Sequence, residues 1–173
     1  MTDEAGASGA SDASGVSGAT GADIDIAQLG ALVGKEMVSP WREVTQEAIA
    51  QFADVTGDRQ WIHVDLDRAR RESSYGTTIA HGFLTLSLIS RLLRDAVGAV
   101  GGTRMAINYG LNKVRFPAPV PSGSRVRGRC MLHNLEPIDG GLQATWSVLI
   151  ECDGSPKPCC AAEWLVRYYP STS

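Results

Sequence analysis

An acidic residue and a histidine lie five positions apart in the segment Thr56–His63, which has the sequence Thr-Gly-Asp-Arg-Gln-Trp-Ile-His. Asp58 can accept hydrogen bonds and protons as a carboxylate, and His63 can exchange a proton near neutral pH. Two such groups around one water molecule would form an acid–base pair. Further along, His81 and Gly82 stand directly ahead of an apolar run, so the sequence offers a second polar segment that could complete a site.

Each of these residues also has a structural explanation. Asp58 follows a glycine, and this pair is common at turns and helix ends. His63 could be a hydrogen-bonded structural histidine, or it could share a lone metal ion with Asp65. We expect His81 chiefly to form a hydrogen bond that fixes the loop leading into the next helix. The longer pattern around these residues must therefore decide between structure and catalysis.

Two helices are predicted to position the polar segments. The first begins after Thr45, a suitable N-cap, and carries an apolar stripe until Gly57 ends it. Little periodicity follows, so an ordered loop with a short helix at Asp67–Glu72 is predicted above the site. The second helix, Ile79–Val97, is apolar on nearly every face, and we expect it to be buried.

The last seventy residues are predicted to form strands separated by short turns. Short connections between consecutive strands favour an antiparallel sheet, and the apolar helix ahead of them needs a large concave surface to cover it. The sequence therefore predicts an α+β fold in which a sheet wraps a central helix. The predicted strands are Arg104–Val114, Ser124–Leu135, Leu142–Glu151 and Cys159–Tyr169, and Ile26–Val38 is predicted to be a short leading segment or edge strand.

The chain has 173 residues, which suits one domain. Residues 1–22 are almost entirely small or polar, so we expect a disordered tail followed by one folded domain over residues 23–173. Five of the 19 acidic residues lie within the first 25 residues, which contain no Lys or Arg, so the rest of the chain has 14 acidic and 16 basic residues. This balance predicts no nucleic-acid partner. Without an apolar span or basic leader, no membrane contact and a cytoplasmic location are expected.

Neither a metal nor a redox cofactor is predicted. The cysteines are Cys130, Cys152, Cys159 and Cys160, and their spacing does not match the CxxC pairs of zinc sites, so we expect reduced, semi-buried thiols. The sequence also has no glycine-rich loop typical of nucleotide binding. Coenzyme A is expected only as part of a substrate.

The two polar segments together resemble the signature of MaoC-like dehydratases, the (R)-specific enoyl-CoA hydratases also called hydratase 2. The resemblance runs from about Trp41 to Pro121 and includes the stretch 114–120, Val-Arg-Phe-Pro-Ala-Pro-Val. This family commonly has Asn-Pro between the Asp and the His, whereas this chain has Gln60-Trp61 and keeps the interval. The resemblance implies a single hot-dog fold, usually a homodimer, in which acyl thioesters bind near the subunit interface.

The resemblance also implies roles for individual residues. Asp58 and His63 would share the catalytic water, with the division of labour between them left open. Gly82 opens the apolar helix, so its N–H is a candidate donor to the thioester oxygen. Ser90 would support the catalytic arrangement, although it could equally bond back to a carbonyl one turn earlier.

Further residues are candidates for substrate contact. The candidates are His81, Trp61, Tyr109 and Arg115. Trp61 could shape the acyl pocket or simply cover the surface. Arg125, Arg127 and Arg129 alternate along a predicted strand and would share one face, where they could meet coenzyme A phosphates or keep the face solvated.

The function expected from this resemblance is the reversible hydration of trans-2-enoyl-CoA to (R)-3-hydroxyacyl-CoA, as in fatty acid metabolism. Two alternatives remain. The same fold could carry an acyl-CoA thioesterase, since fold does not fix function, and release of free thiol would reveal it. The chain could also bind acyl thioesters without turnover as a partner subunit, in which case binding would survive Asp58→Asn.

Overall fold

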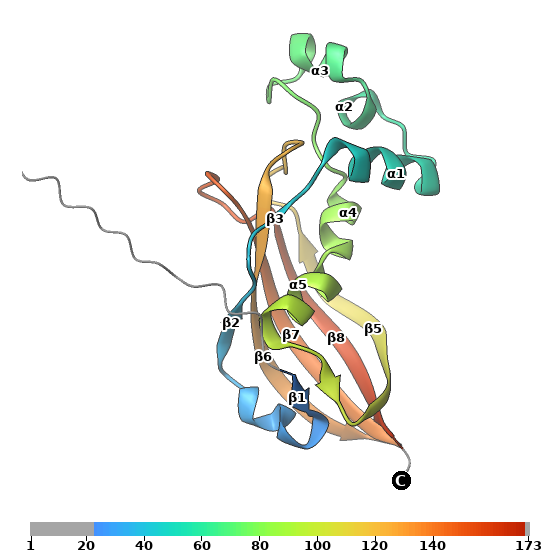
Figure 1. The fold of residues 1–173 in the computed structure, drawn as a ribbon, viewed down its shortest axis with the longest axis vertical. Coiled ribbons are helices and arrows are strands. Elements are labelled where there is room, and N and C mark those ends of the chain that lie inside the picture. Colours follow the sequence, from blue (N-terminus) through green and yellow to red (C-terminus); the bar gives the residue numbers. More distant parts are fainter. Residues whose placement is uncertain (1–22, 172–173) are drawn as a thin grey trace, which may run out of the picture.

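A long antiparallel sheet dominates the computed structural model, which describes residues 23–171 (Figure 1). The tail predicted over residues 1–22 lies outside the described residues. The sheet has six strands in the order β2-β6-β7-β8-β5, with β3 also paired to β6. Their bounds are β2 Glu36–Val38, β3 Arg42–Glu43, β5 Thr103–Arg115, β6 Arg125–Ile138, β7 Gly141–Cys152 and β8 Cys160–Pro170.

The four strands predicted at the end of the chain are confirmed as β5 to β8. Buried and less buried residues alternate along β7 and β8, as expected for strands with one face on a core. One turn is shorter than predicted, because β6 runs through Pro137 to Ile138 and β7 resumes at Gly141. The prediction for residues 26–38 is confirmed only in part: Ile26–Leu32 forms the 3-10 helix η1, and the edge strand is β2.

A helical segment stands at one end of the sheet, as Figure 1 shows. It consists of α1 (Gln46–Thr56), α2 (Trp61–Val64) and α3 (Leu66–Glu72). The Thr45 side chain accepts a hydrogen bond from the Ala48 N–H, which confirms the predicted N-cap. Gly57 ends α1 in the left-handed conformation, with φ of 75°, which other residues adopt at a cost. This turn places Asp58 directly after α1.

The second predicted helix is wrong in extent. Instead of one helix over Ile79–Val97, the chain forms α4 (Gly82–Ser87) and α5 (Ile89–Val97), separated at Leu88. Two hydroxyls of α4 bond back to carbonyls four residues earlier, from Thr85 to His81 at 3.3 Å and from Ser87 to Phe83 at 2.7 Å. Such bonds compete with the regular helical pattern and bend helices, which gives a physical reason for the break.

The core lies between α5 and the concave face of the sheet. Leu92 on α5 approaches β6 so closely that a Cβ at Gly128 would stand 2.9 Å from the Leu92 Cβ. Two small strands, β1 (Ile24–Asp25) and β4 (Val100–Gly101), pair in parallel beside this core. This arrangement of a sheet around a helix is the hot-dog fold, and it confirms the predicted α+β class. The largest fully buried side chains include Trp146, Leu29, Ile49, Leu92, Leu132 and Ile150.

The outer face of β6 is solvated and paired. Arg125, Arg127 and Arg129 form ion pairs with Asp153, Glu151 and Glu36, respectively. These contacts agree with the interpretation of a solvated face, because each guanidinium already has a carboxylate partner.

The four cysteines are buried free thiols. Burial raises the pKa of Cys130 and Cys159 to about 12, and that of Cys160 to about 11. These thiols are therefore protonated and poorly nucleophilic at neutral pH. Within residues 23–171, no helix has both the length and the apolar character needed to cross a membrane.

Candidate active site

The polar segments predicted from the sequence meet where the helical segment joins the sheet. The Ile79 N–H donates to the Ile62 carbonyl at 2.9 Å, which draws the strand-like stretch ahead of α4 alongside α2. The next residue, Ala80, donates to the Val120 carbonyl at 2.8 Å and ties the same stretch to the loop before β6. These two bonds join residues 17 and 40 positions apart in sequence, and they bring three segments of the chain into one site.

His63 is held in one orientation and one tautomer. Its side chain is buried, with 6% of the residue exposed, and Nδ1 lies 2.7 Å from the Ile79 carbonyl. Because a carbonyl only accepts, Nδ1 carries the proton, and the neutral ring keeps its lone pair on Nε2. Burial lowers the pKa of His63 below its ordinary value of 6.5; His81 lowers it further, while the Ile79 carbonyl and Asp58 act against the shift. The site therefore holds a neutral imidazole with one basic nitrogen.

His81 supports both members of the predicted pair. Its Nε2 lies 2.9 Å from the backbone carbonyl of Asp58, and its ring stacks on that of His63 with centroids 3.7 Å apart. Phe52 of α1 packs against the His81 ring, with 5.0 Å between the ring centroids. The loop-fixing role expected for His81 matches this geometry, because the bond to Asp58 restrains the backbone that carries the carboxylate.

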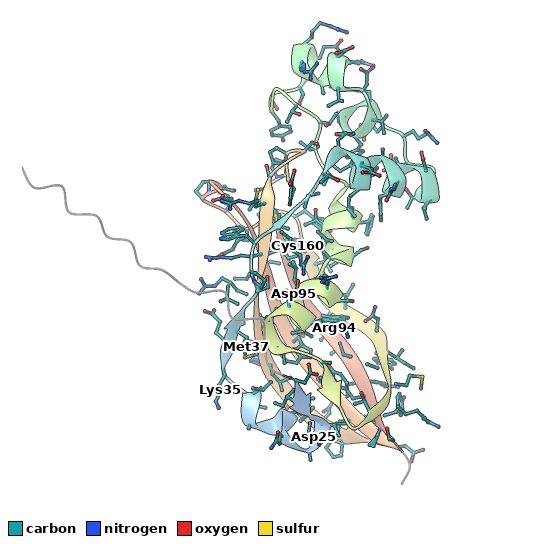
Figure 2. All side chains as sticks on the ribbon, in the orientation of Figure 1. Asp25, Lys35, Met37, Arg94, Asp95 and Cys160 are labelled. Atoms are coloured by element: carbon teal, nitrogen blue, oxygen red, sulfur yellow. The ribbon has the colours of Figure 1, made fainter. Side chains whose placement is uncertain are left out.

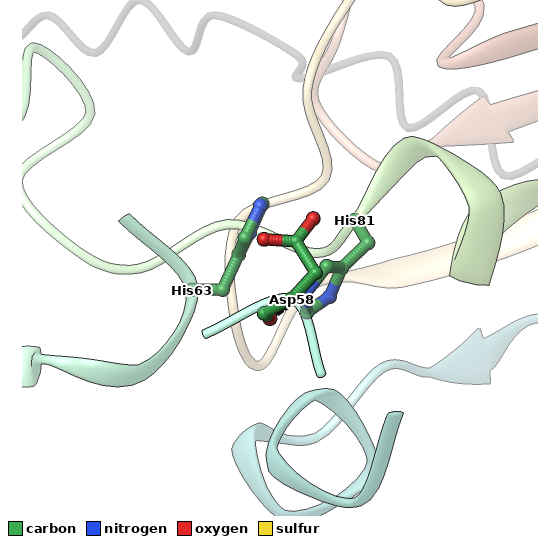
Figure 3. A group of neighbouring side chains, drawn as sticks. All are labelled: Asp58, His63 and His81. Carbon is green, nitrogen blue, oxygen red and sulfur yellow. Dashed lines mark hydrogen bonds between the residues drawn. The ribbon is translucent and has the colours of Figure 1, made fainter. Parts of the chain in front are cut away.

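Asp58 is exposed, and its carboxylate lies beside the two imidazole rings (Figure 3). One carboxylate oxygen accepts a hydrogen bond from the Gln60 N–H at 3.4 Å, an Asx-type turn. A carboxylate oxygen of Asp58 and a ring nitrogen of each of His63 and His81 lie within 4.8 Å of one another. This donor set could surround a water molecule, and its two histidines and one carboxylate are also a set that could hold a transition metal.

A cavity of about 300 Å³ opens beside this group. The Gly82 N–H, at the start of α4, has no backbone acceptor among residues 23–171, which leaves it available to a bound oxygen. Phe116 packs against the Gly82 backbone, since a Cβ there would lie 3.2 Å from its ring. The lining residues are His63, Tyr75, Ile79, Ala80, Gly82, Thr85, Phe116, Pro117, Ala118, Pro119, Val120 and Cys159.

Asp58 and His81 stand beside His63 but are not among the residues that line this cavity, and four further predicted residues do not line it either. Ser90 and Tyr109 line a different cavity between α4, α5 and β5, and the Arg167 guanidinium lies over the Tyr109 ring at 3.3 Å. Trp61 is covered by Arg68, 4.5 Å from its ring centroid, which favours the surface-covering interpretation. Arg115 is exposed and donates to the Val114 carbonyl at 2.7 Å. Their predicted roles toward substrate stay predictions.

Sequence reasoning missed the residues that hold the site from behind. Gln46 donates to the His63 carbonyl at 2.8 Å and accepts a hydrogen bond from the hydroxyl of Thr78, which is fully buried. This network links α1, α2 and the stretch ahead of α4. No local signal could have found it, because Gln46 and Thr78 are 32 positions apart.

A helix wrapped by a sheet, with a buried neutral histidine beside a carboxylate, defines a hot-dog protein with an acid–base site. The comparisons then give the family. Residues 28–147 match the family described as MaoC like domain. Since this match covers more than half of the chain, the chain belongs to the MaoC-like family.

Named relatives and solved structures support the assignment. The chain is 53% identical over 145 residues to 3-hydroxyacyl-thioester dehydratase Z of Mycobacterium tuberculosis (strain ATCC 25618 / H37Rv), covering 83% of this chain and 95% of that protein. It is 41% identical over 145 residues to nodulation protein N of Rhizobium leguminosarum bv. viciae, covering 83% and 90%. The (R)-hydratase from A. caviae superposes with a TM-score of 0.64 at 25% identity, covering 80% of this chain and 96% of that one.

Proposed function

We propose that this chain hydrates trans-2-enoyl-CoA to (R)-3-hydroxyacyl-CoA and catalyses the reverse dehydration, with Asp58 and His63 acting on one water molecule. The observation that carries the proposal is the state of His63: a buried, neutral imidazole with its Nδ1 proton committed to a carbonyl and its Nε2 lone pair free. A carboxylate beside it can accept a hydrogen bond from the second O–H of the water and so fix the orientation of the water. The family membership supports the same chemistry.

One side chain, His63, can make both proton transfers of the reaction. Nε2 of His63 removes a proton from water as the water oxygen bonds to C3, and the π electrons of the C2–C3 double bond move to the thioester oxygen. The imidazolium then returns a proton to C2 as the thioester carbonyl re-forms. Asp58 stays ionised throughout and stabilises the imidazolium, in keeping with its opposing effect on the His63 pKa. The oxygen and the proton are therefore added to the same face of the double bond, because His63 serves both transfers.

Gly82 would supply the donor for the charge that develops on the thioester oxygen. Gly82 lines the same cavity as His63, its N–H has no backbone acceptor among residues 23–171, and a backbone donor of this kind needs no reorganisation during the reaction. No metal enters this scheme, although the Asp58, His63 and His81 donor set could bind one. Assays run in EDTA therefore form part of the test.

A homodimer belongs to the proposal. The outer edge of β5 has no strand paired to it among the described strands, and the middle of β5 carries exposed apolar side chains and no charge. An exposed, apolar sheet edge is a surface that a second copy can cover. The exposed apolar side chains of β5 are Met105, Ile107, Tyr109 and Leu111. Phe83 of α4, which follows Gly82, is exposed as well.

The direct test is an assay with crotonyl-CoA and a longer trans-2-enoyl-CoA in the presence of EDTA. Loss of the conjugated-thioester absorbance, release of free thiol and product chirality are measured together. We expect hydration to the (R)-alcohol without thiol release, and a loss of at least about a hundredfold in kcat for Asp58→Asn, the lower range found when one group that stabilises transition-state charge is removed.

The matched control is Asp54→Asn. Asp54 is an exposed aspartate four residues earlier whose carboxylate pairs with Arg59 at 2.6 Å, so its loss should cost little. Thiol release by the wild type would show a thioesterase instead. Inertness with both substrates, together with acyl-CoA binding that survives Asp58→Asn, would show a binding protein, and activity abolished by EDTA would show a metal enzyme.

A further inference from the structure

His81 lies in the site, yet the proposed proton transfers do not use it. It is more buried than His63, with 3% of the residue exposed, and it does not line the cavity beside His63. Its Nε2 lies 2.9 Å from the Asp58 backbone carbonyl. Because a carbonyl only accepts, Nε2 carries the proton of the neutral ring, and Nδ1 is left as a bare acceptor. Any effect of His81 on the reaction is therefore exerted through Asp58 and His63.

The Nδ1 atom of His81 is buried and forms no hydrogen bond with any group in residues 23–171. Two rings pack against the imidazole instead, Phe52 with 5.0 Å and His63 with 3.7 Å between centroids. A buried polar atom without a partner is costly, and an apolar side chain would fill this place without that cost. The imidazole therefore needs a compensating role, and the contacts of its Nε2 and of its face supply one.

Each histidine is fixed by the backbone of the segment that carries the other. The His63 Nδ1–H donates at 2.7 Å to the carbonyl of Ile79, two residues before His81. The His81 Nε2–H donates to the carbonyl of Asp58, five residues before His63. Between these two bonds the rings stack with their planes 23° apart. Neither ring can turn without breaking a hydrogen bond or the stack, so His81 restrains both the His63 lone pair and the residue that carries the carboxylate.

The stacked ring also acts on the charged form of His63. In the proposed reaction, His63 removes a proton from water and becomes an imidazolium, whose charge is spread over its ring. A cation within about 6 Å of an aromatic centroid is attracted by the face of that ring, more strongly where water is excluded. The neutral His81 ring offers such a face at 3.7 Å. A charged His81 would do the reverse, because a positive charge there lowers the His63 pKa.

Other charges near the two rings come mainly from Asp58. It is the one carboxylate among the described groups that shift the His63 pKa, and it raises that pKa. On the neighbouring α1, Glu47 and Asp54 are engaged by Gln51 and Arg59, respectively. Neither α4 nor the stretch 116–121 contains an acidic or basic residue. The charged residues Arg94 and Asp95 lie on α5, away from the helical segment, as Figure 2 shows.

We propose that His81 is a positioning residue for the hydration: its ring aligns His63 with Asp58, and it stabilises His63 while His63 holds the proton taken from water. This inference rests on the proposed hydratase function and adds a residue to its machinery. His81 does not contact the substrate in this scheme, and Asp58 and His63 remain the reacting pair. The effect of His81 should therefore fall on the chemical step and leave substrate binding unchanged.

Three variants separate the two contacts of His81. His81→Ala removes both the ring and the donor, His81→Gln keeps an N–H near the position of Nε2, and His81→Phe keeps a ring that can stack. With crotonyl-CoA, kcat should fall by about a hundredfold in His81→Ala and by about tenfold in each of the other two, while KM stays near the wild-type value. Circular dichroism checks the fold of each variant. Should His81→Ala not fold, the other two carry the test.

A second readout separates an effect on His63 from an effect on folding. Neither His81→Gln nor His81→Phe carries a charge at position 81, and only His81→Phe places a ring face against His63. His63 should therefore titrate at higher pH in His81→Phe than in His81→Gln. NMR titration of the His63 imidazole signals measures the difference, which a purely structural role would not produce.

The control variant is His133→Gln, since His133 is an exposed histidine on β6. It should keep the wild-type kcat and the wild-type titration of His63. Equal His63 titrations in His81→Gln and His81→Phe, a loss confined to KM, or a wild-type kcat in any of the three His81 variants would overturn the inference. If the wild type hydrates crotonyl-CoA in that case, the hydratase function still stands; if no enoyl-CoA reacts, both proposals fail.

Discussion

At the scale of single residues, the protonation of His63 determines when the proposed base can act. Burial lowers its pKa from 6.5, so the neutral form should persist to a lower pH than in a free histidine. We expect kcat/KM to be constant around neutral pH and to fall on the acid side with a midpoint below 6.5. A pH profile of kcat/KM with crotonyl-CoA measures this midpoint.

The effect of Asp58 on that midpoint provides an internal check. The carboxylate raises the His63 pKa against the effect of burial, so Asp58→Asn should move the His63 titration to still lower pH. NMR titration of the imidazole signals measures this shift even where the variant is inactive. A wild-type midpoint above 6.5, or a higher midpoint in Asp58→Asn, would contradict the assignment of His63 as a buried neutral base.

The residues of the site differ in how far the sequence could predict them. Asp58 and His63 follow a compact signature, and the structure places their polar atoms together. The partners that orient them were not predictable, because the Ile79 carbonyl and the Gln46 amide reach His63 from separate parts of the chain. Ser90 was predicted from the family resemblance, and the structure places it beyond the break at Leu88, in the lining of a different cavity.

At the scale of elements, the packing of α5 on β6 depends on a residue without a side chain. An alanine at position 128 would bring its Cβ to 2.9 Å from the Leu92 Cβ, closer than carbon atoms pack, so the helix or the strand must shift. We expect Gly128→Ala to lower the free energy of unfolding by about 1–3 kcal/mol. Urea unfolding followed by circular dichroism measures the loss.

Gly30→Ala is the comparison for this prediction. Gly30 has ordinary backbone geometry, and a Cβ there would meet only the Leu135 side chain at 3.9 Å. Its effect should be small. Equal losses in the two variants would show that the close approach of α5 to β6 does not govern stability.

The elements themselves were largely predictable, for local reasons. The cap at Thr45 and the stop at Gly57 define α1, and turn residues separate β5 to β8. The division of the apolar helix into α4 and α5 was not predicted. Its cause is that the Thr85 and Ser87 hydroxyls bond to carbonyls one turn earlier. Residue type alone does not show whether a hydroxyl in a helix forms such a bond.

At the scale of the whole molecule, the uncovered edge of β5 leads to a prediction about assembly. Ile107, with 40% of its surface exposed, lies in the middle of this edge strand, so a lysine there should disfavour the contact between two copies. We expect wild-type protein to have the mass of a dimer in light scattering after size exclusion, and Ile107→Lys to shift toward the monomer.

Leu149→Lys is the matched control, since Leu149 is similarly exposed at 39% but lies on β7, inside the sheet rather than at its edge. This variant should keep the wild-type mass. A monomeric wild type, or an equal shift in both variants, would contradict pairing through the β5 edge.

The separation between the candidate catalytic group and the cavity lined by Ser90 and Tyr109 has a consequence for how such a chain can diversify. Asp58, His63 and His81 lie on one segment of the chain, and no residue lines both the cavity beside His63 and the cavity between α4, α5 and β5. Mutations in the walls of the second cavity can therefore accumulate while the proposed acid–base pair stays intact. Gene duplicates built on this plan can change one wall at a time, and they need not pass through an inactive ancestor.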